Sequence, residues 1–178
     1  QCSGSPCVLG QNRAAVVAVG GAGEFLVGGE KWQRTGEGFG FESFGVLRRY
    51  DTAGELAVTT FAMPSPDEAT DVTRALAQRG DGSLVMFGET EPVAFQLDWW
   101  FARLTADGGF QDIITLSIRD EDLAGGVVAR DDGSIVFSGQ SGEFSDEQQF
   151  VASLDADYAS QWQTLGGEFG PLVLGDGD

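Results

Sequence analysis

The sequence predicts an all-β chain of three consecutive four-stranded antiparallel units, and two observations carry this prediction. First, short apolar runs alternate with Gly-centred turns along much of the 178 residues, which include 27 Gly and 5 Pro. Gly adopts positive φ at little cost, so this composition suits strands joined by tight turns. Second, one pattern occurs three times along the chain, and self-similarity of this kind is typical of repeat architectures.

The recurring pattern is a Gly-centred turn, an apolar strand and a second Gly. Three segments align without gaps, at 22–30, 81–89 and 132–140. Each follows another apolar run, and the three runs are Ala14–Val19, Val72–Gln78 and Ala124–Arg130. Two apolar runs separated by Asp-Gly or another Gly-rich turn predict a β-hairpin.

A second hairpin follows in each copy, within 47–61, 101–116 and 151–165. Its last strands are predicted at Leu56–Phe61, Phe110–Leu116 and Gln161–Leu165. Four strands joined in order form an antiparallel meander, which is poorly able to bury its own faces, so neighbouring meanders must stack. The predicted organisation is an N-terminal segment 1–13, units at 14–66, 67–118 and 119–167, and the start of a further copy at 168–178.

The middle copy carries a family pattern. It reads Asp81-Gly-Ser, three apolar residues, one further residue and Gly88, followed later by Phe101-Ala-Arg-Leu and Asp107-Gly-Gly-Phe. This pattern resembles the delta-sixty type of bacterial β-propeller repeat, and the resemblance covers about residues 14–167. It implies three successive blades of a β-propeller, partial or completed by other chains, in a secreted or cell-surface bacterial protein with no assigned enzymatic role.

The outer copies depart from this pattern. The first has Ala22 and Ala53 where a turn Asp is expected, and the third has Tyr158 in place of the second turn's Gly. Kelch-like propellers are a competing assignment, because Gly28-Gly29 and Trp162 resemble parts of that repeat. Propellers close with about 4–8 blades, so three blades leave open edges through which chains could associate.

The charge of the chain excludes several classes of partner. It has 28 acidic and 10 basic residues, a net charge of −18. Such a surface repels phosphate backbones and anionic lipid, which argues against nucleic acid and membrane surfaces. No apolar run reaches the roughly 18 residues that span a bilayer. Cys2 and Cys7 are the only cysteines, and their spacing permits a small disulfide loop, which would indicate an oxidising compartment.

We expect binding at one end of the meanders. The tight turns gather at one end, and the connections at the other end are longer and differ between copies, at 31–43, 62–71, 90–98, 117–122, 141–148 and 166–169. We call this end the long-loop face, since variable loops on a rigid scaffold are the usual place for binding. Its candidate ligand-binding residues are aromatic or acidic: Trp32, Phe39, Phe41, Glu91, Phe95, Asp120, Glu121, Asp122, Phe144 and Asp146.

These residues predict a non-catalytic module that binds a glycan or a protein, although the aromatic rings could instead fold inward and plug the loop bases. The alternative is a structural or assembly unit, a stalk or filament, joined through blade edges. The second alternative is a fragment of a carboxylate-based glycoside hydrolase. The chain has no His, which excludes His-dependent triads and His-based metal sites within it.

Calcium is the one metal that the acidic clusters suit, because hard cations prefer carboxylate oxygens. Its candidate ligands are Asp120, Asp122, Asp131 and Asp132. No other cofactor and no enzymatic activity is predicted.

Two pairs of residues are predicted to be structural. Trp99 and Trp100 are neighbours on one strand, so they face opposite sides. We expect both in the core, with Trp100 packed between blades. Arg49 and Arg103 occupy the same position in two copies, where a salt bridge to a turn carboxylate of the same copy is expected.

Overall fold

The computed structural model describes residues 12–19, 23–34, 41–62, 70–93, 96–118, 121–142 and 148–165, and these residues form strands and turns without any helix. The strands are β1 (Asn12–Val19), β2 (Phe25–Arg34), β3 (Phe41–Tyr50), β4 (Leu56–Ala62), β5 (Thr70–Gln78), β6 (Leu84–Val93), β7 (Gln96–Leu104), β8 (Phe110–Leu116), β9 (Glu121–Ala129), β10 (Ile135–Gly142), β11 (Gln148–Leu154) and β12 (Ser160–Leu165). The predicted all-β class is confirmed. The described part of the chain contains no helix that could cross a membrane.

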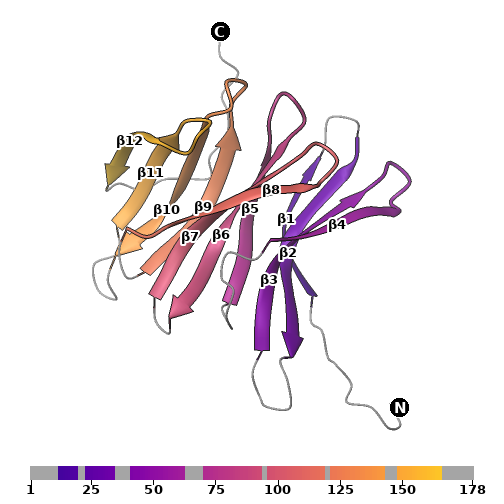
Figure 1. The fold of residues 1–178 in the computed structure, drawn as a ribbon, viewed down its shortest axis with the longest axis horizontal. Coiled ribbons are helices and arrows are strands. Elements are labelled where there is room, and N and C mark those ends of the chain that lie inside the picture. Colours follow the sequence, from indigo (N-terminus) through magenta and orange to yellow (C-terminus); the bar gives the residue numbers. More distant parts are fainter. Residues whose placement is uncertain are drawn as a thin grey trace.

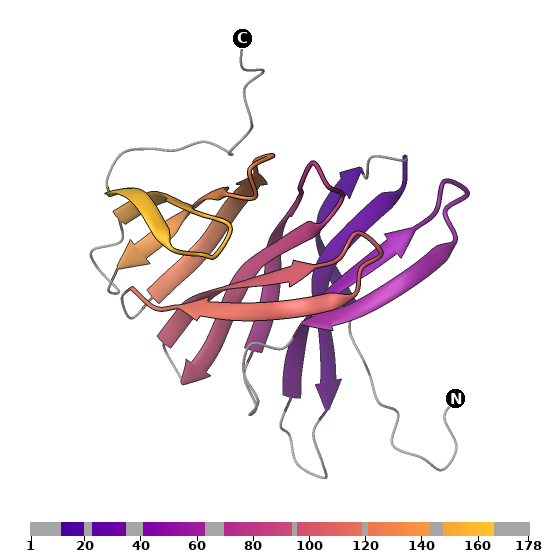
Figure 2. The same cartoon turned by 45° about the horizontal axis from the view of Figure 1, so that its top comes forward.

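The strands pair as three antiparallel meanders, β1–β4, β5–β8 and β9–β12, which we call the first, second and third meanders. Single parallel bridges link them: Ser43 of β3 pairs with Thr70 of β5, and Leu97 of β7 pairs with Glu121 of β9. Figures 1 and 2 show the meanders side by side in chain order, from indigo to yellow. The sheet path stays open among the described residues.

The tight turns between the first two strands of the second and third meanders contain the predicted Asp and Gly residues in turn conformations. Gly82 and Gly133 adopt φ of 86° and 84°, the left-handed conformation that Gly tolerates. Asp81 Oδ1 accepts hydrogen bonds from the amide of Ser83 at 2.9 Å and from its hydroxyl at 2.6 Å. These bonds favour the ionised form, so they lower the pKa of Asp81.

The turns between the last two strands are anchored by a residue that the pattern does not mark. Asp51 Oδ1 accepts from the amides of Ala53 and Glu55 at 2.9 and 2.8 Å. Asp155 makes the same pair of bonds in the third meander, to residues 157 and 159. The turn carboxylate that is absent at Ala53 is therefore supplied two residues earlier, by Asp51.

The stacked meanders bury two apolar cores. The core between the first and second meanders contains Leu26, Leu47, Leu76, Leu84, Met86, Trp100, Ala102 and Leu104. The core between the second and third includes the aromatic residues Phe87, Trp99, Phe101, Phe137, Phe150 and Tyr158. In the second core, Phe87 stacks on Phe101 with ring centroids 4.5 Å apart, and Phe137 meets Phe101 edge-on at 4.9 Å.

The two neighbouring tryptophans confirm the predicted opposite orientation. Trp100 lies in the first of these cores and Trp99 in the second, and both are fully buried. The Trp100 ring covers Gly45 of the first meander and Gly88 of its own meander, and the Trp99 ring covers Gly139 of the third. Trp100 also donates its Nε1–H to the carbonyl of Glu89 at 2.8 Å. Trp100 thus packs between meanders, as predicted.

Arg49 and Arg103 each form a salt bridge within their own meander, as predicted, and each also binds the next meander. Arg49 Nε donates to Glu24 at 2.7 Å, and Arg103 binds Asp112 through Nε, also at 2.7 Å, and through Nη2. Arg49 Nη1 also donates to the carbonyl of Ala106, in a turn of the second meander, at 2.5 Å. Arg103 Nη1 donates in the same way to the carbonyl of Ala156, in a turn of the third meander, at 2.9 Å. The carboxylate partner lies in a turn for Arg49 but in strand β8 for Arg103.

The strands extend further than predicted. Segments 31–43, 90–98 and 141–148 were expected to be loops, but β2 continues to Arg34 and β3 begins at Phe41, while only residues 94–95 separate β6 from β7. Backbone pairing continues through these stretches, with Trp32 opposite Ser43 and Thr90 opposite Asp98. The side chains there are polar and aromatic without alternation, so the periodicity that predicts strands is absent although the hydrogen-bond ladder persists.

The Val72 carbonyl and the Trp100 ring leave no space for a side chain at Gly88. A Cβ there would lie 2.0 Å from the Val72 carbonyl oxygen and 2.6 Å from Trp100 Cζ2, whereas a Cβ at Gly54 would meet nothing within 4 Å. We expect Gly88→Ala to lower the free energy of unfolding by about 3 kcal/mol or more, and Gly54→Ala by only about 1 kcal/mol, the cost of its φ of 82°. Urea unfolding measures both, and equal losses would contradict the close approach of Val72 and Trp100 to Gly88.

Candidate functional site

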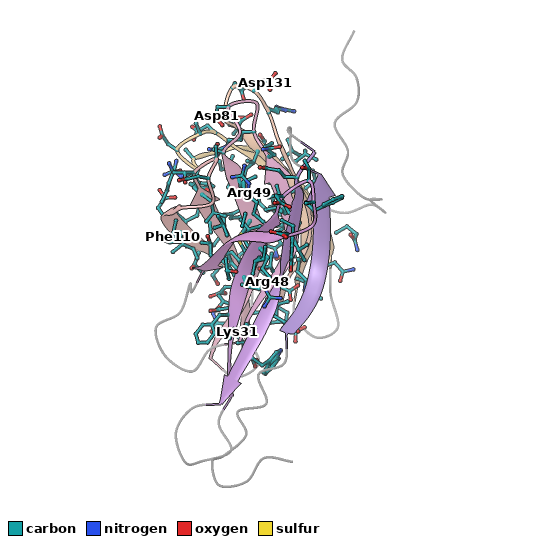
Figure 3. The ribbon with its side chains drawn as sticks, turned by 90° about the vertical axis from the view of Figure 1, so that its right-hand side faces the viewer. Lys31, Arg48, Arg49, Asp81, Phe110 and Asp131 are labelled. Carbon is teal, nitrogen blue, oxygen red and sulfur yellow. The ribbon has the colours of Figure 1, made fainter. Side chains whose placement is uncertain are left out.

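The structure places the described members of the predicted site in strands at one end of the meanders. Trp32 lies near the end of β2, Glu91 near the end of β6, and Glu121 and Asp122 open β9. Phe41 is the first residue of β3. Figure 3 shows Asp81 and Asp131, two turn residues, together at one end of the molecule and Lys31 towards the other. Lys31, next to Trp32, marks the long-loop face.

Several predicted residues lie outside the described ranges. They are the site candidates Phe39, Phe95, Asp120, Phe144 and Asp146 and the predicted disulfide pair Cys2 and Cys7. The site candidates that are described come from all three meanders. Trp32 and Phe41 lie on the paired strands β2 and β3. Glu121 pairs with Leu97 of β7, and β7 also pairs with β6, which contains Glu91.

The three candidate calcium ligands that the structure describes do not come together. Asp122 is the second residue of β9 and is fully buried, whereas Asp131 and Asp132 follow the opposite end of that strand and are exposed. Asp132 Oδ1 instead accepts from the amide and hydroxyl of Ser134, at 2.9 and 2.6 Å. These hydrogen bonds stabilise the turn between β9 and β10. Within the described ranges, no three Asp, Glu, Cys or His side chains are placed to hold a metal ion.

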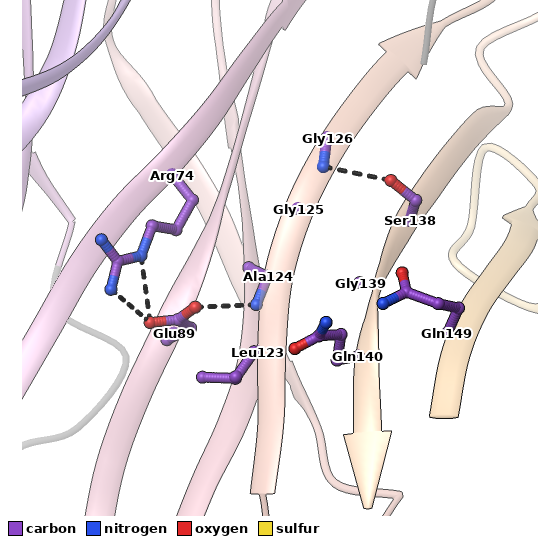
Figure 4. A pocket seen from close by; sticks show the side chains of 10 residues that line it. All are labelled: Arg74, Glu89, Leu123, Ala124, Gly125, Gly126, Ser138, Gly139, Gln140 and Gln149. Carbon is purple, nitrogen blue, oxygen red and sulfur yellow. Dashed lines mark hydrogen bonds and ion pairs between the residues drawn. The ribbon is translucent and has the colours of Figure 1, made fainter. Parts of the chain in front are cut away.

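A polar hollow of about 570 Å³ lies where the second and third meanders meet. It is lined by Arg74, Glu89, Leu123, Ala124, Gly125, Gly126, Ser138, Gly139, Gln140 and Gln149, seen from close by in Figure 4. β9 and β11 begin at the long-loop face and β10 ends there. These strands line the hollow with residues from their middle, such as Gly126 and Ser138, and with residues nearer to that face, such as Gln140 and Gln149.

Glu89 and Arg74 form the charged wall of the polar hollow. Glu89 is 5% exposed, and its Oε2 accepts from Arg74 Nε at 3.0 Å and Nη2 at 2.9 Å. Its Oε1 accepts from the Ala124 amide of the third meander at 2.8 Å. One buried carboxylate therefore joins two meanders, and the Arg74 charge balances it, so this wall carries no net charge.

Irregular pairing shapes the floor of the polar hollow. β5 has a bulge at Arg74, between the paired residues Thr73 and Ala75. β9 is irregular at Gly125 and Gly126, and there the Gly126 amide donates to the Ser138 hydroxyl at 3.3 Å instead of joining the ladder. Bulges redirect side chains and leave backbone groups unpaired. In this protein the bulges turn Arg74 towards the hollow and expose the backbone of the two glycines.

The site predicted from the sequence does not include Arg74, Glu89, Gln140 or Gln149. One signal was available: the three aligned nine-residue segments all end on a Glu or a Gln, at Glu30, Glu89 and Gln140. Alternation places this side chain on the face shared by Val85 and Phe87, which turns towards the next meander. A polar residue at the end of each apolar strand therefore marked the interface between meanders.

A row of buried polar side chains crosses the second meander near the long-loop face. Asp71 of β5 pairs with Thr90 of β6, and Thr90 pairs with Asp98 of β7. Asp71 is 1% exposed, and its carbonyl accepts from the hydroxyl of Ser43 in the first meander at 3.1 Å. Burial raises the pKa of Asp71 to about 7, against a smaller lowering by the Thr90 hydroxyl beside it.

Neither a search of protein-family models nor a search of curated proteins gives a match to this chain.

The raised pKa of Asp71 predicts a pH-dependent stability. In the folded state the Asp71 carboxyl keeps its proton up to about pH 7, whereas in the unfolded chain it loses the proton near pH 3.8. The protonated carboxyl therefore makes its full contribution to the free energy of unfolding below about pH 4, and this contribution is lost as the pH rises to 7. Asp71→Asn should therefore leave the free energy of unfolding almost unchanged at pH 4 and raise it at pH 8 by roughly 1–4 kcal/mol.

Denaturant unfolding at several pH values tests this prediction, with Asp131→Asn as the matched substitution at an exposed aspartate. A loss of stability in Asp71→Asn at pH 8 would show that the ionised carboxylate is favoured in the fold, contrary to the prediction.

Proposed function

We propose that this chain is a non-catalytic binding module of propeller type, secreted or held at a bacterial cell surface, whose ligand is an uncharged glycan. The observation that carries the ligand assignment is the polar hollow near the long-loop face. Its Arg74–Glu89 pair is charge-balanced, and its remaining polar side chains are the amides of Gln140 and Gln149 and the hydroxyl of Ser138.

The chemistry of the polar hollow favours sugar hydroxyls. Each Gln amide offers both donors and an acceptor, and the outer part of the Arg74 guanidinium offers further donors, since its side chain is 41% exposed. The exposed backbone at Gly125 and Gly126 gives a ligand room to approach closely. The net charge of −18 disfavours an anionic ligand, and the balanced wall gives a cationic one no partner.

The propeller assignment is supported by the arrangement of the meanders. Each is four strands in chain order, as in a propeller blade. Their first strands β1, β5 and β9 lie next to one another, and each pair of successive meanders buries an apolar core between their faces. The resemblance of the middle copy to delta-sixty repeats favours the same assignment.

A glycan array of neutral oligosaccharides tests the proposed ligand class, with calorimetry on any glycan that binds. Gln140→Ala and Gln149→Ala should each weaken binding by about tenfold, the cost of one or two unmade hydrogen bonds. Gln111→Ala, at an exposed position on β8 outside the polar hollow, is the matched control and should leave affinity unchanged. Full binding by both hollow variants, or no neutral glycan bound by the folded chain, would contradict the proposal.

An assembly unit joined through blade edges is the second candidate, and one observation favours it. Leu56 and Phe110 occupy the same position at the start of β4 and β8 and are 54% and 49% exposed. Both strands pair on one side only among the described residues, so their outer edges present unpaired backbone beside apolar side chains.

Light scattering of the wild-type chain and of a Leu56→Ser/Phe110→Ser double variant tests the assembly function. Association through these edges predicts a discrete oligomer for the wild type and a monomer for the variant. The exposed Thr59→Ser change on β4 serves as control and should leave the mass unaltered. A wild-type monomer at high concentration would exclude assembly of the isolated chain and leave the glycan-binding proposal untouched.

A further inference from the structure

The polar hollow extends across several strands. Its lining residues come from β5 (Arg74), β6 (Glu89), β9 (residues 123–126), β10 (residues 138–140) and β11 (Gln149). Because β9, β10 and β11 pair consecutively, the hollow measures about 10 Å across these three strands alone. The 2.8 Å hydrogen bond from Ala124 to Glu89 and the ion pair from Glu89 to Arg74 extend it beyond β9. The row from Arg74 to Gln149 in Figure 4 is therefore longer than one sugar ring.

The hydrogen-bonding groups that remain available lie towards both ends of the hollow. At one end, Arg74 binds Glu89 through Nε and Nη2, whereas its Nη1 forms no hydrogen bond to a described residue. Towards the other end, Gln140 and Gln149 lie directly opposite each other on paired strands, and their amides form no hydrogen bond to a described residue either. Neither amide is among the buried unpartnered groups, so a ligand can reach both.

Hydrogen bonds must supply most of the binding energy, because no aromatic side chain lines the hollow. Each net hydrogen bond improves affinity by roughly two- to tenfold, but association first costs the translational and rotational freedom of the ligand. A single sugar ring reaches the groups at one end only and gains few hydrogen bonds to offset this cost. A chain of rings that reaches both ends gains the full set and loses that freedom only once.

We propose that the polar hollow binds a linear neutral oligosaccharide that lies across β9, β10 and β11 with about three rings in contact. This inference rests on the proposed glycan-binding function and specifies its ligand. Hydroxyls at one end of the chain bind the amides of Gln140 and Gln149, and a hydroxyl at the other end accepts from Arg74 Nη1. Between these ends the hollow has an exposed glycine, Gly125, whose lack of a side chain leaves room for the middle ring.

A chain-length series tests this proposal. Two linear neutral series, from glucose to maltopentaose and from mannose to β-1,4-linked mannopentaose, are titrated into the ¹⁵N-labelled chain. The amide signals of Gly125, Gly126 and Gln149 report the hollow. We expect at least one series to bind at least tenfold more tightly as the trisaccharide than as the monosaccharide, because the second end adds one or more net hydrogen bonds. Affinity should then level off, with a gain of less than about threefold beyond the tetrasaccharide.

Variants at the two ends give a second test. Arg74→Lys keeps a cation beside Glu89 but removes Nη1, and Gln149→Ala removes the amide on β11. Each should weaken trisaccharide binding roughly two- to tenfold, and Gln111→Ala, outside the hollow, should leave it unchanged. Each variant is first checked for cooperative melting. If Arg74→Lys does not fold, the chain-length dependence together with Gln149→Ala decides the matter.

Three outcomes would overturn the proposal: equal affinity for monosaccharide and trisaccharide, a trisaccharide that only one of the two folded end variants weakens, or no binding by either series. In each case a neutral glycan bound on the array would still support the proposed function. An array on which the folded chain binds no neutral glycan would refute both.

Discussion

The second meander of this chain hides two apolar faces, and it does so through adjacent tryptophans on β7. Trp100 turns to the first meander and Trp99 to the third, and both insert where the neighbouring strands have Gly in place of a side chain. The tight Gly-centred turns and the order of the strands bring these flat surfaces within contact distance. Without the pairing of large rings and Gly, the meanders would be separate sheets with exposed faces.

Polar contacts at the interfaces lie mainly where the apolar packing ends. At the turn end, Arg49 and Arg103 bind carboxylates of their own meanders and carbonyls of the next. Towards the long-loop face, the Glu89 carboxylate of the second meander accepts a hydrogen bond from the Ala124 amide of the third. Both kinds of contact fix the meanders relative to one another, because directional bonds define a register that apolar packing leaves loose. The polar hollow therefore has rigid walls that come from two meanders.

The sequence predicted the class of fold, the strand order and the burial of Trp99 and Trp100, because these depend on local alternation and on Gly in turns. It placed the strand ends too early, since polar residues near Trp32 and Glu91 continue the ladder without an apolar signal.

The polar hollow was missed because it depends on a contact between Glu89 and Ala124, 35 residues apart, and on bulges that no local pattern marks. The calcium candidates were grouped by proximity in sequence, but a strand separates Asp122 from Asp132. Tyr158 in a left-handed turn was noticed only as a departure from Gly, while its buried ring explains why it is tolerated.

The direction of the arginine clamps has a consequence for synthesis on the ribosome. Arg49 precedes the carbonyl that it holds by 57 residues, and Arg103 precedes its own by 53. At about 5–20 residues per second, the donor is made roughly 3–11 seconds before its acceptor, whereas a hairpin forms within microseconds. Each guanidinium is therefore already present when the turn that it will hold is synthesised. Synthesis thus supplies the contacts between meanders in order from the N-terminal side, with the donor always made before its acceptor.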